Sequence, residues 1–295
     1  MEGIRDIKRR LRAVQGTAKI TRAMQLVAAS KMRRAQLAAT AGRRHALRLE
    51  ELADKILRME LPTNDLPPLL SRRDVKCRCI VFVATDKGLC GSLNQNTFKL
   101  IREKFPQDAK YVAIGKKGGQ LLAAAKLQLI GEFSVNDGVP YHMARAVANF
   151  LRDAYLCKEI DAVDVVHPLF INTLRQNPVA QRLLPLDGLG ENIRAKRDML
   201  PDIGRPLPED GREITVEPSL ARLVETLLES FLQKEMHHIL LEAKAAEQSA
   251  RMVAMKAATD NAEIFAKELL LSYNKARQAA ITAEILEIRS ADSTP

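Results

Sequence analysis

Apolar residues near the start of the chain recur at alternating spacings of three and four, as in a coiled-coil seam. They are Ile4, Ile7, Leu11, Val14 and Ala18, and a similar spacing returns at Leu49, Leu52 and Ile56. No Pro occurs between Gly3 and Met59. The pattern predicts one continuous helix of about 55 residues, far longer than an ordinary globular helix.

The last part of the chain has the same character. Pro218 suits the first turn of a helix, and neither Pro nor Gly follows before Ile288. The apolar stripe consists of Leu220, Leu223, Leu227, Phe231, Ala262, Phe265, Leu269, Tyr273, Ala276 and Ala280. Neither helix can bury its stripe alone, so we expect the two to pair antiparallel, with residue numbers that sum to roughly 280–290.

Small residues support this pairing, because they let two helices approach closely. One helix offers Ala23, Ala28, Ala29, Ser30, Ala35, Ala38 and Ala39, and the other offers Ala243, Ala245, Ala246, Ser249, Ala250 and Ala254. Four methionines at 24, 32, 252 and 255 add adaptable contact surface. No window approaches about 18 uninterrupted apolar residues, so we do not expect a membrane span.

Residues 61–213 show a different pattern, in which short β-rich runs alternate with helical segments. Strands are predicted at 77–85, 111–115, 127–133 and 163–171, with helices through Phe98 and Ile101 and around Ala144–Leu156. This alternation indicates a mostly parallel sheet covered on both faces, a Rossmann-like α/β domain. Residues 187–213, rich in Pro, Gly and Asp, are predicted to form a long exposed loop.

The predicted fold class is therefore α/β plus a long antiparallel two-helix coiled coil. We expect an N-terminal coiled-coil helix at 1–60, a central α/β domain at 61–213 and a C-terminal coiled-coil helix at 214–295. The first helix leaves the small domain and the last helix re-enters it. We therefore expect a two-helix rod attached to a small α/β domain.

The net positive charge of the chain indicates an acidic partner. The formal net charge is +10, and residues 1–49 carry thirteen Lys and Arg against Glu2 and Asp6. One-signed charge over many turns repels itself unless a partner supplies acid. Nucleic acid is one candidate partner, although residues 1–60 contain no Phe, Tyr or Trp for base stacking. An acidic protein surface fits at least as well.

The candidate chemistry is sparse. The turn Asp86-Lys87-Gly88-Leu89-Cys90-Gly91 follows a strand and opens a helix, where phosphate-binding loops occur, but its glycine spacing matches neither nucleotide-binding motif. GKKGG at 115–119 fails the same comparison, and turns that need glycine backbone angles explain both. We expect no cofactor, although a nucleotide-dependent enzyme built on the α/β domain remains an alternative.

Cysteine and histidine do not suggest a metal site or a catalytic set. Cys77 and Cys79 are expected on one face of a strand, without a second pair or a histidine at ligand spacing. His237 and His238 are adjacent on a helix, point in different directions and are expected at its solvated rim. We see no activated nucleophile, so the chain is not expected to be catalytic.

The compartment follows from the same residues. Four cysteines in 295 residues do not make a disulfide scaffold, and the N-terminal MEGIRDIKRRLRAV lacks the apolar core of a secretion signal. It is Arg-rich like a transit peptide, but the helical pattern begins at Ile4 and continues. We expect mature structure there and a reducing cytoplasm.

Three segments carry a resemblance to a known family. IKRRLRAVQGTAKITRAMQLVAASKMRRAQ, TDKGLCGSLN and ARMVAMKAATDNAEIFAKELLLSYNKARQAAITAEILEI resemble the corresponding segments of the gamma subunits of F-type, H+-transporting ATP synthases, most strongly the bacterial ones. They cover both ends of the chain and the strand-turn-helix of the middle domain. The resemblance thus extends over most of the predicted architecture.

The resemblance implies a central stalk in a rotary motor. The coiled coil would insert into a hexamer of three alpha and three beta subunits, with its C-terminal end deepest. The α/β domain would form the foot, near the epsilon subunit and the membrane c-ring, on the cytoplasmic face of the bacterial inner membrane and without inserting into it. Catalysis would belong to the beta subunits, and no nucleic acid would be involved.

The resemblance also implies contact residues. Arg22, Met24 and Lys31 would face acidic loops of beta. Arg277 with Gln278 would make a second, polar contact with beta, higher in the sleeve that the alpha and beta subunits form around the coiled coil. The turn of Asp86, Lys87, Gly88, Cys90 and Gly91 would be structural. Chloroplast relatives carry a regulatory cysteine pair in an insertion, and Cys77 and Cys79 do not lie in such an insertion.

Overall fold

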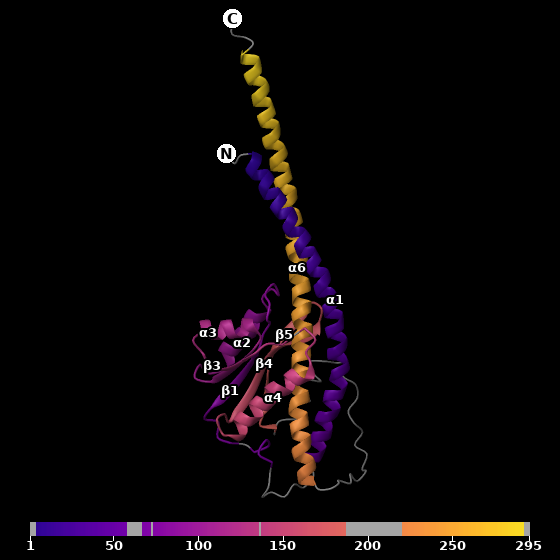
Figure 1. The fold of residues 1–295 in the computed structure, drawn as a ribbon, viewed down its shortest axis with the longest axis vertical. Coiled ribbons are helices and arrows are strands. Elements are labelled where there is room, and N and C mark those ends of the chain that lie inside the picture. Colours follow the sequence, from indigo (N-terminus) through magenta and orange to yellow (C-terminus); the bar gives the residue numbers. More distant parts are fainter. Residues whose placement is uncertain (1–3, 58–66, 72, 136, 187–219, 292–295) are drawn as a thin grey trace. The chain divides into compact units, whose positions relative to one another are not determined.

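The computed structural model describes residues 4–57, 67–71, 73–135, 137–186 and 220–291. It confirms the two long helices, α1 (Ile4–Leu57) and α6 (Leu220–Ala291), each without interruption (Figure 1). Between them lie β1 (Arg78–Val83), α2 (Leu93–Lys104), β2 (Lys110–Ile114), α3 (Lys116–Ala124), β3 (Gln128–Phe133), α4 (Tyr141–Leu156), β4 (Ala162–Asn172) and β5 (Arg175–Leu184). The predicted loop at 187–213 lies outside the described residues.

The five strands form one sheet in the order β3-β2-β1-β4-β5. The first four are parallel, as predicted, with Val81 opposite both Val112 and Val165. Strand β5 runs antiparallel to β4 and was missed by the sequence analysis. Its sequence, RQNPVAQRLL, is rich in polar residues and contains Pro178. Proline has no backbone N–H to donate, and an edge strand tolerates this because no further strand lies beside it.

Helices cover both faces of the sheet, as the buried strand pattern predicts. Alternating residues of β1 point to opposite sides. Ile80 and Phe82 join a core with α2 and α3, whereas Val81 and Val83 join a second core with α4. This second core also contains α6 side chains, namely Val224, Leu228, Phe231, Leu232, Met236, Ile239, Leu240 and Ala243. The first half of α6 is therefore a layer of the α/β fold.

The chain divides into two compact units, one of residues 1–29 with 251–295 and one of residues 30–250. Both α1 and α6 contribute to each unit. The predicted domains at 1–60, 61–213 and 214–295 instead follow secondary structure, and they stay a prediction. Within the described residues, no helix has the length and apolar character needed to cross a membrane.

Antiparallel pairing of the two long helices is confirmed in each unit. In the first unit the Thr21 and Thr259 hydroxyl oxygens lie 2.7 Å apart, at the lower end of the predicted register. In the second, Ala39 packs with Ala245 and Ala246. The small-residue face is narrower than predicted, because Ala23, Ser30 and Ala38 are exposed.

Candidate functional site

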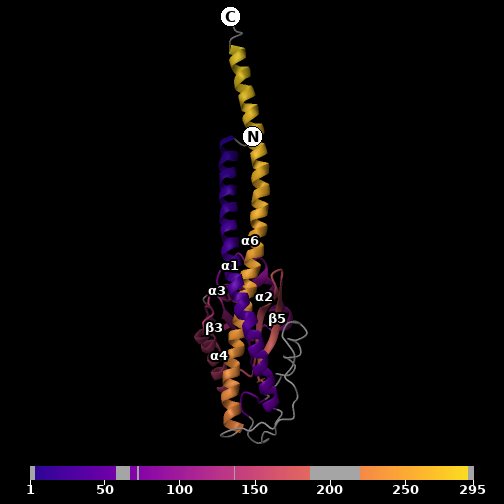
Figure 2. The same ribbon diagram turned by 90° about the vertical axis from the view of Figure 1, so that its right-hand side faces the viewer.

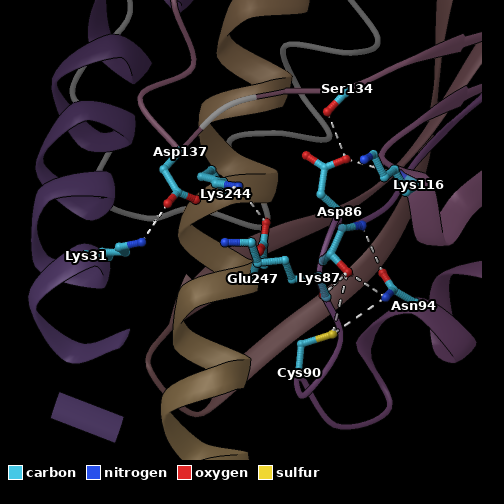
Figure 3. A network of polar contacts seen from close by, with 11 residues as sticks. Lys31, Asp86, Lys87, Cys90, Asn94, Lys116, Ser134, Asp137, Lys244 and Glu247 are labelled. Atoms are coloured by element: carbon cyan, nitrogen blue, oxygen red, sulfur yellow. Dashed lines mark hydrogen bonds and ion pairs between the residues drawn. The ribbon is translucent and has the colours of Figure 1, made fainter. Parts of the chain in front are cut away.

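Thr85 lies at the centre of the hydrogen bonds that hold the turn after β1, and Figure 3 labels its partners Lys87, Cys90 and Asn94. The Asn94 side chain accepts from Thr85 N at 3.2 Å and donates to Thr85 Oγ1 at 2.8 Å, and that hydroxyl donates to the Lys87 carbonyl at 2.8 Å. Cys90 is buried, with its Sγ 3.5 Å from Asn94 Nδ2. These bonds fix the backbone of the turn from within.

Positive backbone φ angles, which glycine adopts readily, occur in both glycine segments, as expected. Gly91 has a positive φ of 61°, and so does Leu89 at 63°, whereas Gly88 is not among the positive-φ residues. The positive φ of Leu89 is uncommon for a non-glycine side chain. In the second glycine segment, Gly115 has φ 97°.

Asp86 connects the carboxyl ends of three strands. Its Oδ1 accepts from the backbone N–H of Lys116 at 3.1 Å and from the Ser134 hydroxyl at 3.1 Å. Lys116 begins α3, so the carboxylate also lies at the N-terminus of a helix, where negative charge is stabilising. The turn Asp86–Gly91 therefore has a structural role, because it ties together the carboxyl ends of these strands.

The crevice where doubly wound sheets bind ligands is filled by this chain itself. Such ligands bind at the carboxyl ends of the strands, where the strand order reverses, here between β1 and β4. The cavity at this edge has a volume of only about 20 Å³ and is closed by the α6 residues Leu240, Ala243, Lys244 and Glu247. Ligand pockets usually have about 300–1,000 Å³. A nucleotide does not fit this crevice, which argues against the alternative of a nucleotide-dependent enzyme.

The cysteine pair and the histidine pair have structural surroundings. Cys79 is fully buried in β1, and burial raises the pKa of its thiol to about 12, so it packs as a protonated, apolar group. His237 Nε2 donates to the Val139 carbonyl at 2.9 Å, and His238 Nε2 lies 3.7 Å from a Glu242 oxygen. No three His, Cys, Asp or Glu side chains gather as metal ligands among the residues described.

A cluster of charges joins three parts of the second unit. Lys31 Nζ of α1 lies 2.6 Å from Asp137 Oδ2, and Lys244 Nζ of α6 lies 3.2 Å from Asp137 Oδ1. Lys244 also contacts Glu247 Oε2 at 3.0 Å. Of these residues the sequence analysis singled out only Lys31. The loop aspartate has no recognisable spacing to either lysine, so only the fold brings them together.

The cluster gives a prediction for acid titration. The hydrogen bond from Lys31, then that from Lys244, lowers the pKa of Asp137 from 3.8 to about 2. Because the folded-state value is the lower one, the stabilisation is present above about pH 4 and is lost as pH falls through about 2. Carbon NMR of the Asp137 carboxyl should show this midpoint, and Lys31→Gln should raise it. A midpoint near 4 in the unmodified chain would contradict the contact.

The predicted contact residues on the helices lie in different surroundings. Arg22 Nη1 is 3.4 Å from Glu263 Oε1, and both side chains are exposed. Met24 is half-buried, and Arg277 and Gln278 are exposed on α6. Lys31 belongs to the other compact unit and is paired with Asp137. The structure therefore does not gather the five residues into one site, and their contacts with a partner stay a prediction.

Exposed apolar side chains follow the later part of α6. They are Ile264, Phe265, Leu270, Leu271, Ile281, Ile285 and Leu286. Because Thr259 lies beside Thr21, equal rise along antiparallel helices brings Ile4 level with roughly residue 276. Beyond that residue α6 continues past the described start of α1. These side chains make the later part of α6 a candidate surface for protein contact.

These features define a class of protein. An α/β domain whose ligand crevice is filled by its own helix, together with paired helices that expose apolar and basic side chains, is typical of a structural subunit that works through protein contacts. The comparisons with known proteins identify the family within this class.

The family model described as ATP synthase matches residues 3–293. The ATP synthase gamma chain of Opitutus terrae is 42% identical over 292 residues, covering 99% of this chain and 98% of that one. That of Methylacidiphilum infernorum is 38% identical over 296 residues, with 99% and 98% covered. The chain belongs to the ATP synthase gamma-chain family.

Solved structures show the same fold. A chain in the OSCP/F1/c-ring structure of Euglena gracilis mitochondrial ATP synthase has a TM-score of 0.68 at 18% identity, with 98% of this chain and 93% of that chain covered. A chain in the central stalk/c-ring structure from Tetrahymena thermophila has a TM-score of 0.59 at 24% identity, with 81% and 99% covered.

Proposed function

We propose that this chain is the central-stalk rotor subunit of a proton-translocating F-type ATP synthase. It couples rotation of a membrane ring to ATP synthesis or hydrolysis at catalytic sites on partner subunits, and it is not itself an enzyme. The observation that carries the proposal is the 42% identity to an ATP synthase gamma chain over almost the whole length of both proteins. The filled sheet crevice fits a subunit that works by contact alone.

The proposed partners are three alpha and three beta subunits, an epsilon subunit and the c-ring. The exposed apolar side chains of α6, from Ile264 to Leu286, supply a surface for a close sleeve. The basic first helix, with thirteen Lys and Arg in residues 1–49, suits acidic loops on the inner side of that sleeve. The similar solved structures from Euglena gracilis are an OSCP/F1/c-ring complex and a rotor of mitochondrial ATP synthase.

Arg22, Met24, Lys31, Arg277 and Gln278 are the proposed contacts with beta. Arginine binds a carboxylate through two parallel hydrogen bonds, which gives strength and directional specificity. Arg22 makes an exposed contact of 3.4 Å with Glu263, and exposed pairs contribute about 0–1 kcal/mol. It can therefore exchange Glu263 for a partner carboxylate at small cost.

The proposed mechanism needs no chemistry on this chain. A pair of helices inside a ring of three beta subunits presents a different side to each of them. Each beta subunit is then biased toward a different conformation, and a ligand or contact shifts a conformational equilibrium only by such a difference in interaction. Rotation of the helices exchanges the three conformations in turn.

The proposed location is the cytoplasmic face of the bacterial inner membrane. The chain would be held there peripherally, through the ring and the other subunits. Supporting this location, the similar gamma chains come from bacteria such as Opitutus terrae and Methylacidiphilum infernorum.

Arg277→Ala tests the function at a proposed contact. In a complex reconstituted with alpha, beta and epsilon subunits and the membrane sector, we expect ATP-driven proton pumping to fall by about tenfold, the effect of losing one charge-assisted hydrogen bond. The helix content of the isolated chain should not change, because Arg277 is exposed.

Lys267→Ala is the matched control, since Lys267 is an exposed cation on the same helix. It should leave pumping close to that of the unmodified complex. Equal pumping by the Arg277 variant would remove Arg277 from the contact surface. Failure of the unmodified chain to co-purify with alpha and beta would contradict the proposed function itself.

A further inference from the structure

The segment between β3 and α4 spans the sheet edge and both long helices of the second unit. At its start, Ser134 donates to Asp86 at the end of β1. In its middle, Asp137 contacts Lys31 of α1 and Lys244 of α6 (Figure 3). One short segment therefore contacts the strand ends, the first helix and the last helix.

The segment contacts α6 at two positions along the helix. The Val139 carbonyl accepts from His237 Nε2 at 2.9 Å, and Asp137 contacts Lys244, seven residues further along the same helix. Seven residues are about two helical turns, so both contacts lie on one side of α6. Tyr141 packs edge-on against His237, with ring centres 5.5 Å apart. This part of the segment is fixed to α6 independently of Lys31.

The Asp137 carboxylate divides its oxygens between the helices. Oδ2 accepts from Lys31, and Oδ1 faces Lys244. Lys244 is a buried cation, with 9% of its side chain exposed, and it needs the negative charges of Asp137 and Glu247 around it. Arg34 lines the cavity of about 210 Å³ beside the cluster. Without the Asp137 charge, Lys244 would lose one of the two carboxylates that it contacts, and Lys31 would lose the carboxylate to which it donates.

The first helix depends on this contact more than α6 does. Side chains of α6 from Val224 to Ala243 belong to the large core beneath the sheet. The α1 residues of this unit do not join that core among the residues described. They meet the fold through the small Ala35 and Ala39, which pack with Phe170 and α6. Alanine buries little area, so a charged contact adds substantially to how firmly α1 is held.

We propose that Asp137 is a clasp that fixes α1 to the α/β fold, so that torque applied to the sheet passes into both long helices. The proposal rests on the rotor function given above. Torque reaches α6 through the core that it shares with the sheet. Torque reaches α1 through Asp137 and through the Ala35–Ala39 contact. Opening the clasp leaves α1 free to lag behind α6 under load.

Asp137→Asn tests the clasp in the full-length chain. The amide keeps the size of the side chain but removes its negative charge and replaces one acceptor oxygen by a donor, so it cannot offer a separate oxygen to each lysine. Hydrogen exchange of the α1 amides at residues 31–41 should accelerate by about fivefold, the factor that loss of a modest ion pair produces. Exchange in β1 should stay unchanged, because its core is not touched.

Glu103→Gln is the matched control, because Glu103 forms an exposed ion pair with Lys99 on α2, at 3.7 Å. It should not change exchange in α1. Lys31→Gln should also accelerate exchange in α1, and the double variant should add little beyond Asp137→Asn alone, since both substitutions remove the Lys31–Asp137 contact. Independent, additive effects of the two substitutions would overturn the clasp.

The reconstituted complex then tests torque transfer. With Asp137→Asn, the ratio of protons pumped to ATP hydrolysed should fall at least about twofold while hydrolysis continues. If the unmodified chain supports pumping and the variant matches it, the clasp is wrong and the rotor function stands. A variant that pumps better than the unmodified chain would also overturn it, because the Asp137 contact would then limit coupling instead of supporting it. If the unmodified chain assembles but never couples, the proposed function fails instead.

Discussion

Gly115→Ala should destabilise the second unit by about 3 kcal/mol or more, the range of strained backbone combined with overpacking. A Cβ atom at this position would lie 2.5 Å from the Ala84 carbonyl oxygen, and Gly115 has φ +97°. The clash is with backbone just after β1, which cannot move without breaking the hydrogen bond from Ala84 N to the Ile114 carbonyl, and the positive φ strains any residue that carries a Cβ atom. Denaturant unfolding measures the loss directly.

Gly88→Ala is the control for this substitution. Gly88 lies in the neighbouring turn, where an added Cβ meets no heavy atom within 4 Å. Its free energy of unfolding should change by less than about 1 kcal/mol. Equal losses for the two variants would show that the Gly115 conformation is not required.

Phe231→Ala should cost about 3–5 kcal/mol of unfolding free energy, as for other large core aromatics. Phe231 is 3% exposed and belongs to the core between the sheet and α6. The prediction tests whether the first half of α6 is a layer of the α/β fold. Protection of β1 amides from hydrogen exchange should fall together with that of α6, since the two share this core.

Phe265→Ala provides the comparison within the same helix. Phe265 is 51% exposed, so its removal should change stability by no more than about 0.5 kcal/mol. It should instead weaken assembly with alpha and beta, if the exposed stripe meets their sleeve. A large loss of stability at Phe265, or none at Phe231, would contradict the different surroundings of the two halves of α6.

Periodicity made most of the fold predictable. The two uninterrupted apolar stripes predicted α1, α6 and their antiparallel register, which Thr21 and Thr259 confirm. Short β-rich runs predicted β1 to β4 as strands of a mostly parallel sheet, which the structure confirms. Strand β5 was missed because an edge strand needs neither alternation of polar and apolar residues nor a backbone N–H at every residue. Its Pro178 therefore argued against a strand in the sequence, although an edge strand tolerates it.

The local pattern could not show what covers each helix. Residues 220–250 were predicted as half of a rod, yet many of their side chains are buried against the sheet and α1 together. A helix surrounded by protein loses its polar face, and the Ala-rich stretch from Ala243 to Ala246 is consistent with either surrounding. Only the arrangement of the whole unit distinguishes the two.

Functional residues were predicted only as far as resemblance reached. Arg22, Lys31 and Arg277 were proposed because they lie in segments similar to the family, and their roles stay a prediction. Asp137 was not found, since its partners Lys31 and Lys244 are more than a hundred residues away on either side. Long-range ion pairs of this kind leave no spacing in the sequence. They depend on where the loop after β3 meets the helices.

Rotation of this chain against its partners is the most direct test of the account. Cys157 is an exposed thiol at the end of α4 and can carry a visible probe once half-buried Cys77 is changed by Cys77→Ser. In a complex whose beta subunits are fixed to a surface, the probe should turn in one direction when ATP is added, in three equal steps per turn. A probe that stays still while the same particles hydrolyse ATP would contradict the account.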